Sequence, residues 1–385
     1  MKKEDYYIDL ILDKCVSLKK GKSVFISYNI YNKVFVQKLV EKLHSQGIKD
    51  IFMECIDPFY EHHFLKSSSI EEIKKSKYFD SSIYNKYAEK NAAFIFFTSP
   101  VPGLMDDIED EKLTLVSKIK NQTKKYFIEK ETSYQISWTI VPLYNKYWEE
   151  SLGINNLEEI LYDICLVNKN ASENWNKEIR KSNEYVKKLN ELKIDALRIE
   201  NCLGTDITIG LPKNYEFQGV GNVSILVNLP SYEVFTSPDR NKVDGIVYSS
   251  KPLYYNDAVI ENFYLEFKSG KVSKFGAKKG KKILENIIKS DKGSSFLGEV
   301  ALVDKDSPIS KTDIIFKNTL LDENASCHLA LGRGFGIGAE NDLLKKGVNI
   351  SDIHVDFMIG TDDIKVLGIK NNEEVLIMEN GKFVL

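Results

Sequence analysis

The chain has 385 residues, 43% of them hydrophobic, which is enough for about two domains with substantial cores. Its 53 Lys and Arg residues nearly balance its 56 Asp and Glu residues and give a formal net charge of -3. No basic stripe with interleaved aromatic residues is present in the sequence, so nucleic acid is not an expected partner.

The N-terminus and the cysteines indicate the compartment. The first residues, MKKEDYYIDLILDKC, place acids and tyrosines where a signal peptide needs an uninterrupted apolar core. No apolar run in the sequence approaches the roughly 20 residues of a membrane span. The five cysteines form no CxxC pair and are odd in number, which favours reduced thiols. We therefore expect a cytoplasmic protein with no membrane partner.

The first half alternates between strand and helix patterns. The spacing of apolar residues predicts a helix over 5–19, a strand over 23–28, a helix over 31–46 that is closed by Gly47, and a strand over 50–55. Further strands are predicted within AAFIFFTSP (92–100) and QISWTIVP (135–142). Strands that alternate with helices imply an α/β N-terminal domain with a mostly parallel sheet.

The second half has a different pattern. Residues 157–193 become helical and increasingly charged and are interpreted as a connecting helix, which places an N-terminal domain at 1–187 and a second domain at 188–385. Beyond it, alternating apolar residues and Ser-Gly or Asn-Gly turns predict antiparallel strands and hairpins. The Lys-rich stretch 268–283 is interpreted as a solvated hairpin followed by the start of a helix. We expect an α+β domain.

Acid and histidine residues lie among apolar or small residues in this second half. A carboxylate in such a setting is costly to bury unless a cation or hydrogen bonds compensate its charge, so several of them together suggest a shared divalent metal. The candidates are Glu233, Glu299, Glu323, His328, His354 and Asp356.

Taken singly, these residues leave alternatives open. In an extended segment His354 and Asp356 point to the same face and can hold one metal, or the Asp can simply orient a structural histidine. A lone histidine such as His328, beside Cys327, is also compatible with a satisfied core residue. Glu233 fits an outward-facing strand position, and Glu323 fits a loop carboxylate.

In their order, the motifs resemble a known family. From about Ala196 to Ile369 the chain is similar to the thermophilic-type metalloaminopeptidases, the aminopeptidase T and aminopeptidase S group, and the similarity extends more loosely over the N-terminal half. The matching stretches are GTDITIGLP (204–212), NLPSYEVFTSPDR (228–240), GEVALV with SPI (298–309), NASCHLALG (324–332) and HVDFMIG (354–360).

The resemblance implies hydrolysis of the N-terminal amino acid from short peptides at a site with two divalent ions. By motif, it places the metal ligands at Glu233, Glu299, His328, His354 and Asp356, with Glu323 as a further ligand or as the general base. Carboxylate and imidazole donors suit zinc, cobalt or manganese. Two ions about 3.5–4 Å apart can share a bridging carboxylate and water, and Glu299 is our candidate for the bridge. The resemblance also implies a homodimer that encloses the site.

One position departs from the family pattern. The family carries a tyrosine shortly after its histidine, and here the stretch LGRGFGIG (331–338) places Phe335 there. The resemblance implies that the hydroxyl of this tyrosine donates a hydrogen bond to the tetrahedral oxyanion. Loss of one such donor typically lowers turnover by about 10²–10³-fold. Two alternatives to an active aminopeptidase follow: a catalytically weak or silent member that binds metal together with peptides or a protein partner, and a related metal-dependent amide hydrolase. Arg333, Tyr232 or a backbone amide are the groups that can replace the missing hydroxyl.

Overall fold

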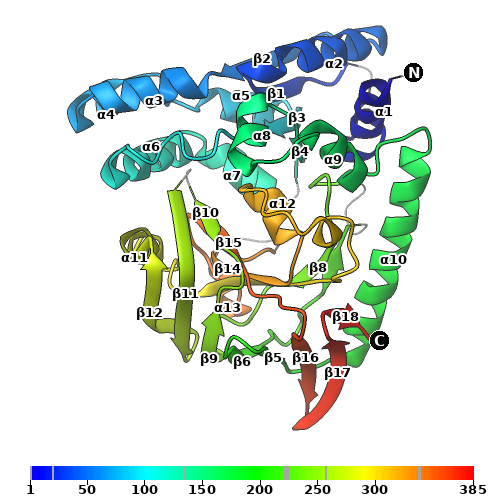
Figure 1. Ribbon diagram of the computed structural model, residues 1–385, viewed down its shortest axis with the longest axis vertical. Coiled ribbons are helices and arrows are strands. Elements are labelled where there is room, and N and C mark those ends of the chain that lie inside the picture. Colours follow the sequence, from blue (N-terminus) through cyan, green and yellow to red (C-terminus); the bar gives the residue numbers. More distant parts are fainter. Residues whose placement is uncertain (1, 20, 134, 221–224, 256–257, 337–339) are drawn as a thin grey trace. The chain divides into compact units, whose positions relative to one another are not determined.

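The structure is a computed structural model that describes residues 2–19, 21–133, 135–220, 225–255, 258–336 and 340–385. The chain divides into two compact units (Figure 1). Unit 1 comprises 1–176 with 223–231 and 256–258, and unit 2 comprises 177–222, 232–255 and 259–385. The division between 176 and 177 falls inside one helix. The boundary at 187/188 stays a prediction about where independently folding domains meet.

Unit 1 is built on a parallel sheet in the strand order β2-β1-β3-β4. The strands are β1 (Val24–Asn29), β2 (Ile51–Ile56), β3 (Ala93–Thr98) and β4 (Ser137–Pro142). Every residue of β1 is buried, as a central parallel strand with helices on both faces requires. The four predicted strand segments therefore contain these strands to within one or two residues, and the predicted α/β class with a mostly parallel sheet is confirmed.

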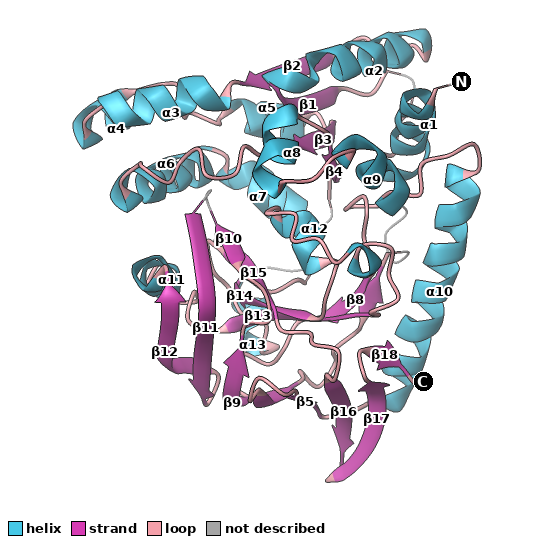
Figure 2. Ribbon diagram, viewed as in Figure 1, coloured by secondary structure: helices cyan, strands magenta, loops and turns pink. Residues whose placement is uncertain are grey.

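Helices flank this sheet (Figure 2). The amphipathic helix α2 (Lys33–Ser45) buries Val36, Leu39 and Leu43, which share one face because they recur every three or four residues. The other helices of unit 1 are α1 (Lys3–Leu10), followed by a π-helical turn (Ile11–Cys15), and α3 (Pro58–Ser67), α4 (Ile70–Lys75), α5 (Ile83–Glu89), α6 (Asp110–Thr123), α7 (Lys125–Thr132), α8 (Lys146–Leu152) and α9 (Leu157–Ile164).

The predicted connecting helix is interrupted. Helix α9 ends at Ile164, and α10 (Ala171–Leu192) begins after Leu166, whose φ of 56° no right-handed helix can accommodate.

Among the described residues, no helix combines the length and the apolar character that a membrane span needs.

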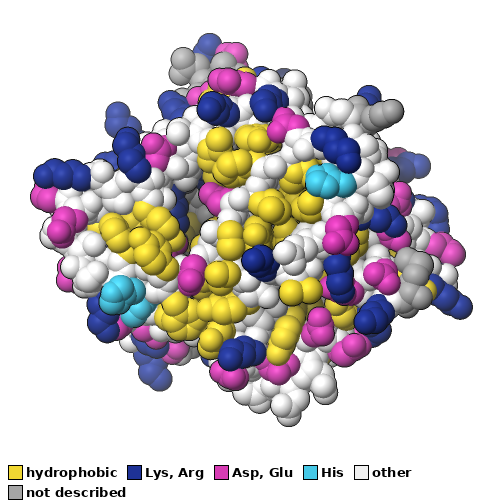
Figure 3. Space-filling view, turned by 90° about the horizontal axis from the view of Figure 1, so that it is seen from above, with side chains coloured by type: hydrophobic (Ala, Val, Ile, Leu, Met, Phe, Trp, Pro, Cys, Tyr) yellow, Lys and Arg dark blue, Asp and Glu magenta, His cyan; other side chains and the backbone are white. Residues whose placement is uncertain are grey.

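On the face of the molecule drawn in Figure 3, hydrophobic side chains lie in separate patches with basic and acidic side chains between them.

Unit 2 contains a long, mainly antiparallel sheet in the order β10-β11-β9-β6-β5-β16-β17-β18, with β12 paired to β11. Its strands are β5 (Ala196–Glu200), β6 (Asp206–Gly210), β9 (Val243–Tyr248), β10 (Leu253–Tyr255), β11 (Ala258–Lys268), β12 (Lys271–Lys279), β16 (Lys365–Lys370), β17 (Glu373–Glu379) and β18 (Lys382–Phe383). The predicted Lys-rich hairpin is β11 and β12, and the helix α11 (Lys281–Ile288) follows it as expected.

A shorter antiparallel sheet of unit 2 has the order β15-β14-β13-β8-β7. Its strands are β7 (Gln218–Gly219), β8 (Glu233–Thr236), β13 (Leu297–Val303), β14 (His328–Gly332) and β15 (His354–Met358). One apolar cluster joins side chains of this short sheet, such as Val300 and Leu329, to side chains of the long sheet, such as Ile207 and Val247. The short sheet therefore uses one face for the core and has the other face available for polar side chains.

Candidate metal centre

The short sheet of unit 2 brings predicted site residues together on one face. Side chains alternate between the faces of a strand, and directly opposed residues of neighbouring strands share a face. Glu299 and Asp356 both lie opposite Ala330, His354 lies opposite Gly332, and His328 lies opposite Ala301. Glu233 lies opposite Val303, on the same face as residues 299 and 301. Five of the six candidate ligands thus share the face that points away from the apolar core.

Four of these five ionisable side chains are buried, and His354 is partly buried. The exposed fractions are 7% for Glu233, 4% for Glu299 and 1% for His328, so none of them is the solvated surface residue that an outward-facing strand position would give. A buried carboxylate is costly unless opposite charge or hydrogen bonds offset its lost hydration. The short sheet therefore holds a group of charges that needs a counter-charge.

The histidines provide part of that counter-charge. Nε2 of His328 lies 3.0 Å from Oε2 of Glu233. Nε2 of His354 lies 3.0 Å from Oε2 of Glu299 and 3.2 Å from Oδ1 of Asp356. In each ring the other nitrogen, Nδ1, faces a backbone carbonyl, that of Ser326 at 3.0 Å for His328 and that of Arg333 at 2.7 Å for His354. Because a carbonyl oxygen can only accept, Nδ1 of each ring carries a proton and donates to it. Nε2 of both rings then faces the carboxylates, and this is the arrangement in which histidines bind metals.

The pKa values reflect burial and the interactions between these carboxylates and histidines. Burial raises the pKa of Glu299 to about 7, although the hydrogen bond and charge of His354 act against it. Burial would lower the pKa of His328, but its hydrogen bond and ion pair with Glu233 raise it to about 10. The pKa of His354 is also well above its usual range despite burial, because Asp356 and Glu299 face it. Protons on the histidines thus balance the carboxylates, and a divalent cation can take over that role.

The donor atoms also have the spacing that a metal requires. Among the described residues, two sets of donor atoms each lie within 4.8 Å of one another, one from Glu233, Glu299 and His328 and the other from Glu299, His354 and Asp356. Glu299 belongs to both sets. Oδ1 of Asp356 is buried and accepts no hydrogen bond from the described residues, although Nε2 of His354 lies 3.2 Å from it. A buried carboxylate oxygen without a hydrogen-bond partner fits a ligand to a divalent ion. The mixture of oxygen and nitrogen donors fits such an ion as well.

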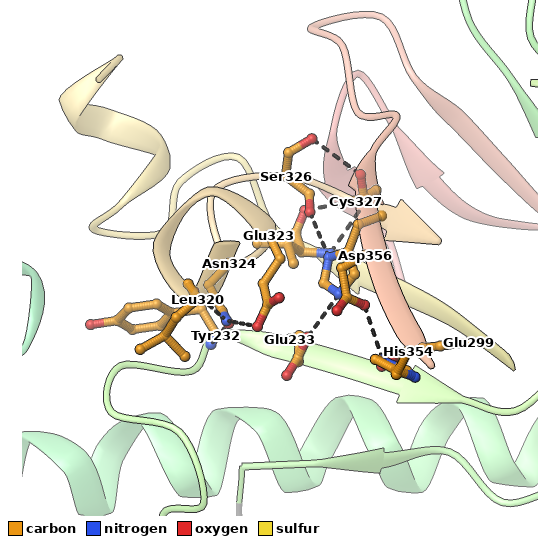
Figure 4. Close-up of polar contacts among 12 residues, drawn as sticks. Tyr232, Glu233, Glu299, Leu320, Glu323, Asn324, Ser326, Cys327, His354 and Asp356 are labelled. Atoms are coloured by element: carbon orange, nitrogen blue, oxygen red, sulfur yellow. Dashed lines mark hydrogen bonds and ion pairs between the residues drawn. The ribbon is translucent and has the colours of Figure 1, made fainter. Parts of the chain in front are cut away.

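Glu323 approaches the cluster from a different element. It is the last residue of the short helix α12 (Thr319–Glu323) and is 8% exposed, so it is neither in a loop nor solvated. Figure 4 shows its carboxylate directed toward the space between Glu233 and Asp356. Burial, followed by the charges of Asp356 and Glu233, raises its pKa well above the usual range. Its oxygens are not part of either set of donor atoms described above.

Comparison with known proteins places the chain in a family. Residues 1–383 match the family described as thermophilic metalloprotease (M29). The chain belongs to this family. It is 33% identical to aminopeptidase AmpS of Bacillus subtilis over 399 residues, covering 98% of this chain and 97% of that protein. It is 29% identical to aminopeptidase T of Thermus thermophilus over 390 residues, covering 96% and 95% of the two chains.

The fold of this metalloprotease agrees with a solved structure. The structure of wild-type AmpT from Thermus thermophilus matches it with a TM-score of 0.89 at 28% identity, over 100% of this chain and 99% of that one. The predicted family and the predicted fold class are therefore confirmed. Membership of a metalloprotease family also means that the protein uses a metal.

Phe335 lies beside the cluster of this metalloprotease. Its ring centroid is 5.1 Å from that of His354 and 5.3 Å from that of Phe235. Its backbone is held by Ser237, whose Oγ accepts from the Phe335 N–H at 2.7 Å. The ring therefore stands next to the candidate ligand His354, although residues 337 and 338 of the same stretch lie outside the described residues.

The groups considered as substitutes for the missing hydroxyl are placed differently. Figure 4 shows the Tyr232 ring pointing away from the carboxylates. The backbone carbonyl of Arg333 accepts from His354, so this residue orients a candidate ligand through its main chain.

Sequence reasoning missed the residues that hold the candidate ligands. Ser326 and Arg333 act through their carbonyls, which no sequence pattern distinguishes. Asn324 is completely buried and hydrogen-bonded to the segments of both Glu233 and Glu323. The available signal for Asn324 was its place between Glu323 and the stretch ASCHLALG (325–332), which contains His328.

Proposed function

We propose that this metalloprotease is an aminopeptidase that releases the N-terminal amino acid from short peptides at a site with two divalent ions. The observation that carries the proposal is the position of Glu299, which belongs to both sets of donor atoms. The similarity to AmpS and aminopeptidase T over nearly the whole chain supports the choice of an aminopeptidase over other metal-dependent amide hydrolases.

The ligand assignment follows the two sets. Glu233 and His328 would hold one ion, His354 and Asp356 the other, and Glu299 would contribute to both. The hydrogen bonds from each Nδ1 to a carbonyl fix the rings so that Nε2 is the donor. Zinc, cobalt and manganese all suit this combination of oxygen and nitrogen donors. When bound, such ions polarise a scissile carbonyl and lower the pKa of a water molecule.

Glu323 is our candidate for proton transfer. Its carboxylate faces the cluster from a separate helix, and its raised pKa is the property expected of a group that takes a proton from water and gives it to the leaving amine. Direct coordination by Glu323 is the alternative, and retained metal affinity in a Glu323→Gln variant would decide against coordination.

Phe335 can shape this site but cannot donate a hydrogen bond. Its ring packs against His354 and restricts the freedom of that imidazole. The hydrogen bond to a developing oxyanion must then come from another group of the chain, or turnover is lower than the site would otherwise allow.

We propose a cytoplasmic location, which agrees with the five free thiols, and a homodimer as the working assembly. Gel filtration with light scattering tests the dimer, and a monomer at micromolar concentration would contradict it.

The test of the function is a chelation and add-back assay. The metal-free protein is supplied with zinc, cobalt or manganese and incubated with short peptides and with the same peptides acetylated at the N-terminus. We expect release of the first residue from free peptides only, and only after metal is returned. Stoichiometric metal binding without release from any peptide would favour the silent, peptide-binding member, and equal cleavage of acetylated peptides would contradict an aminopeptidase.

A further inference from the structure

Asn324 connects the two segments that carry Glu233 and Glu323. It is 0% exposed and follows Glu323 directly in the chain. Its Oδ1 accepts from the backbone N–H of Tyr232, the residue before Glu233, at 2.8 Å. Its Nδ2 donates to the carbonyl of Leu320 at 3.1 Å and, over a longer distance of 3.4 Å, to Oε1 of Glu323 (Figure 4).

The partners of Asn324 fix the orientation of its amide. The N–H of Tyr232 can only donate, so the side-chain oxygen must face it, and the carbonyl of Leu320 can only accept, so the nitrogen must face that. A rotation of the amide by 180° would put like groups together on both sides. The side chain is therefore held in one orientation in a buried setting, where each of its hydrogen bonds is costly to lose.

The helix that carries Glu323 depends on such contacts. At five residues, α12 is too short to be stable by itself. The carboxylate of Asp322 accepts from the N–H groups of two residues that precede the helix, Phe316 at 2.7 Å and Asn318 at 3.0 Å. These bonds hold the helix to the preceding loop but do not reach the short sheet. The bond from Asn324 to Tyr232 joins the end of the helix to the beginning of β8.

We propose that Asn324 is a positioning residue that fixes Glu323 relative to Glu233. This inference rests on the proposed function, in which Glu233 is a metal ligand and Glu323 transfers protons or coordinates. Through Tyr232 the amide holds the start of β8, and through Nδ2 it holds one oxygen of the Glu323 carboxylate. Asn324 belongs to neither of the two sets of donor atoms, so in this proposal it acts through Tyr232 and Glu323.

Two substitutions separate the hydrogen bond that Asn324 accepts from Tyr232 from those that it donates to Leu320 and Glu323. Asn324→Asp keeps the shape and the oxygen that accepts from Tyr232, but it loses both donated hydrogen bonds and adds a negative charge beside Glu323. Asn324→Ala removes every connection. The matched control is Asn190→Asp: Asn190 of α10 accepts from the N–H of Phe217 at 2.8 Å and donates to its carbonyl at 3.1 Å, so the same change removes an amide donor elsewhere in unit 2.

The readouts are hydrogen exchange at the Tyr232 amide, zinc affinity of the metal-free protein, and kcat and KM with a short peptide. Exchange at Tyr232 should rise at least about tenfold in Asn324→Ala and stay within about threefold of the control in Asn324→Asp. Substitution of a residue that orients metal ligands typically lowers metal affinity or activity by about 10–100-fold. We therefore expect kcat of both Asn324 variants to fall by about 10–100-fold while KM stays within about threefold of wild type.

The outcomes distinguish this proposal from the proposed function. Folded variants whose Tyr232 exchange, zinc affinity and kcat all stay within about twofold of Asn190→Asp would overturn the role of Asn324. Wild type and Asn190→Asp that bind zinc but release no amino acid would overturn the aminopeptidase instead, and the exchange and zinc measurements would still decide about Asn324. If Asn324→Ala does not fold, the isosteric Asn324→Asp carries the test.

Discussion

The two faces of the short sheet in unit 2 differ although the same strands build both. On β14, Leu329 and Leu331 enter the apolar core, whereas His328 and Ala330 lie on the acid and histidine face. On β13, Val300 and Leu302 alternate in the same way with Glu299 and Ala301. Burial of the apolar face stabilises the fold, whereas the other face buries charges that histidine protons or a divalent cation must compensate. Stability and function can thus be changed separately by substitutions one residue apart.

The largest effect is expected on the acid and histidine face. Glu299→Gln keeps the size of the side chain but removes the charge shared by the two sets of donor atoms. We expect kcat/KM for a short peptide to fall by about 10³-fold or more, because bound ions supply several kcal/mol of transition-state stabilisation. Glu266→Gln on β11, where the carboxylate pairs with Lys274 at 3.0 Å, is the control and should retain activity. Wild-type metal content in Glu299→Gln would remove this residue from the ligand set.

A substitution on the core face should lower the stability of the fold and leave metal affinity nearly unchanged. Leu329 is 0% exposed, and Leu329→Ala should lower the free energy of unfolding by about 2–5 kcal/mol through the lost contacts and the cavity. Metal affinity of the folded protein should stay within about threefold of wild type. Denaturant unfolding and zinc titration measure the two quantities. A loss of metal affinity as large as the loss of stability would show that the faces are not independent.

Metal removal should link the two faces through stability. A ligand that binds only the folded protein stabilises it by about 2.7 kcal/mol at 100 times its Kd. Chelation should therefore lower the Tm of wild type by several degrees and leave that of Glu299→Gln nearly unchanged. Differential scanning calorimetry with and without chelator measures this. The same decrease in both proteins would place the stabilising ion elsewhere.

The smallest effect is expected from Phe335→Tyr. The new hydroxyl would extend from a ring that is 5.1 Å from His354, centroid to centroid. We expect kcat to rise by up to about tenfold, less than a full oxyanion donor provides, because other groups of the site are not adjusted to it. Phe235→Tyr adds a hydroxyl to the neighbouring ring and serves as the control. An unchanged kcat would mean that another group already donates to the oxyanion.

The sequence predicted those parts of the fold that local patterns determine. Buried parallel strands such as β1 are continuous apolar runs, and the β11 and β12 hairpin has its Ser-Gly turn, so both were predicted. The short helices α3 and α4 were missed, although Asp57 before Pro58 and the capping box formed by Ser69 and Glu72 were readable start signals. Helix α3 mixes polar and aromatic residues and α4 has only six residues, so both have weak apolar periodicity. Burial of Leu65 and Ile73 in one apolar cluster stabilises them instead.

The site could be predicted only as a set of residues. Individually, Glu233 and His328 were compatible with a surface and a core position, and the order of the motifs decided for a site. The register that places Asp356 and Glu299 opposite the same Ala330 depends on pairing between segments far apart in the chain. The role of Asn324 depends on the contact of α12 with the start of β8, which no local pattern encodes.

Anomalous diffraction from crystals of the zinc-loaded protein tests the central claim most directly. We predict two anomalous peaks on the acid and histidine face, both within bonding distance of the Glu299 carboxylate, one beside His328 and the other beside His354. No peak on this face, or a single ion that does not touch Glu299, would contradict the account.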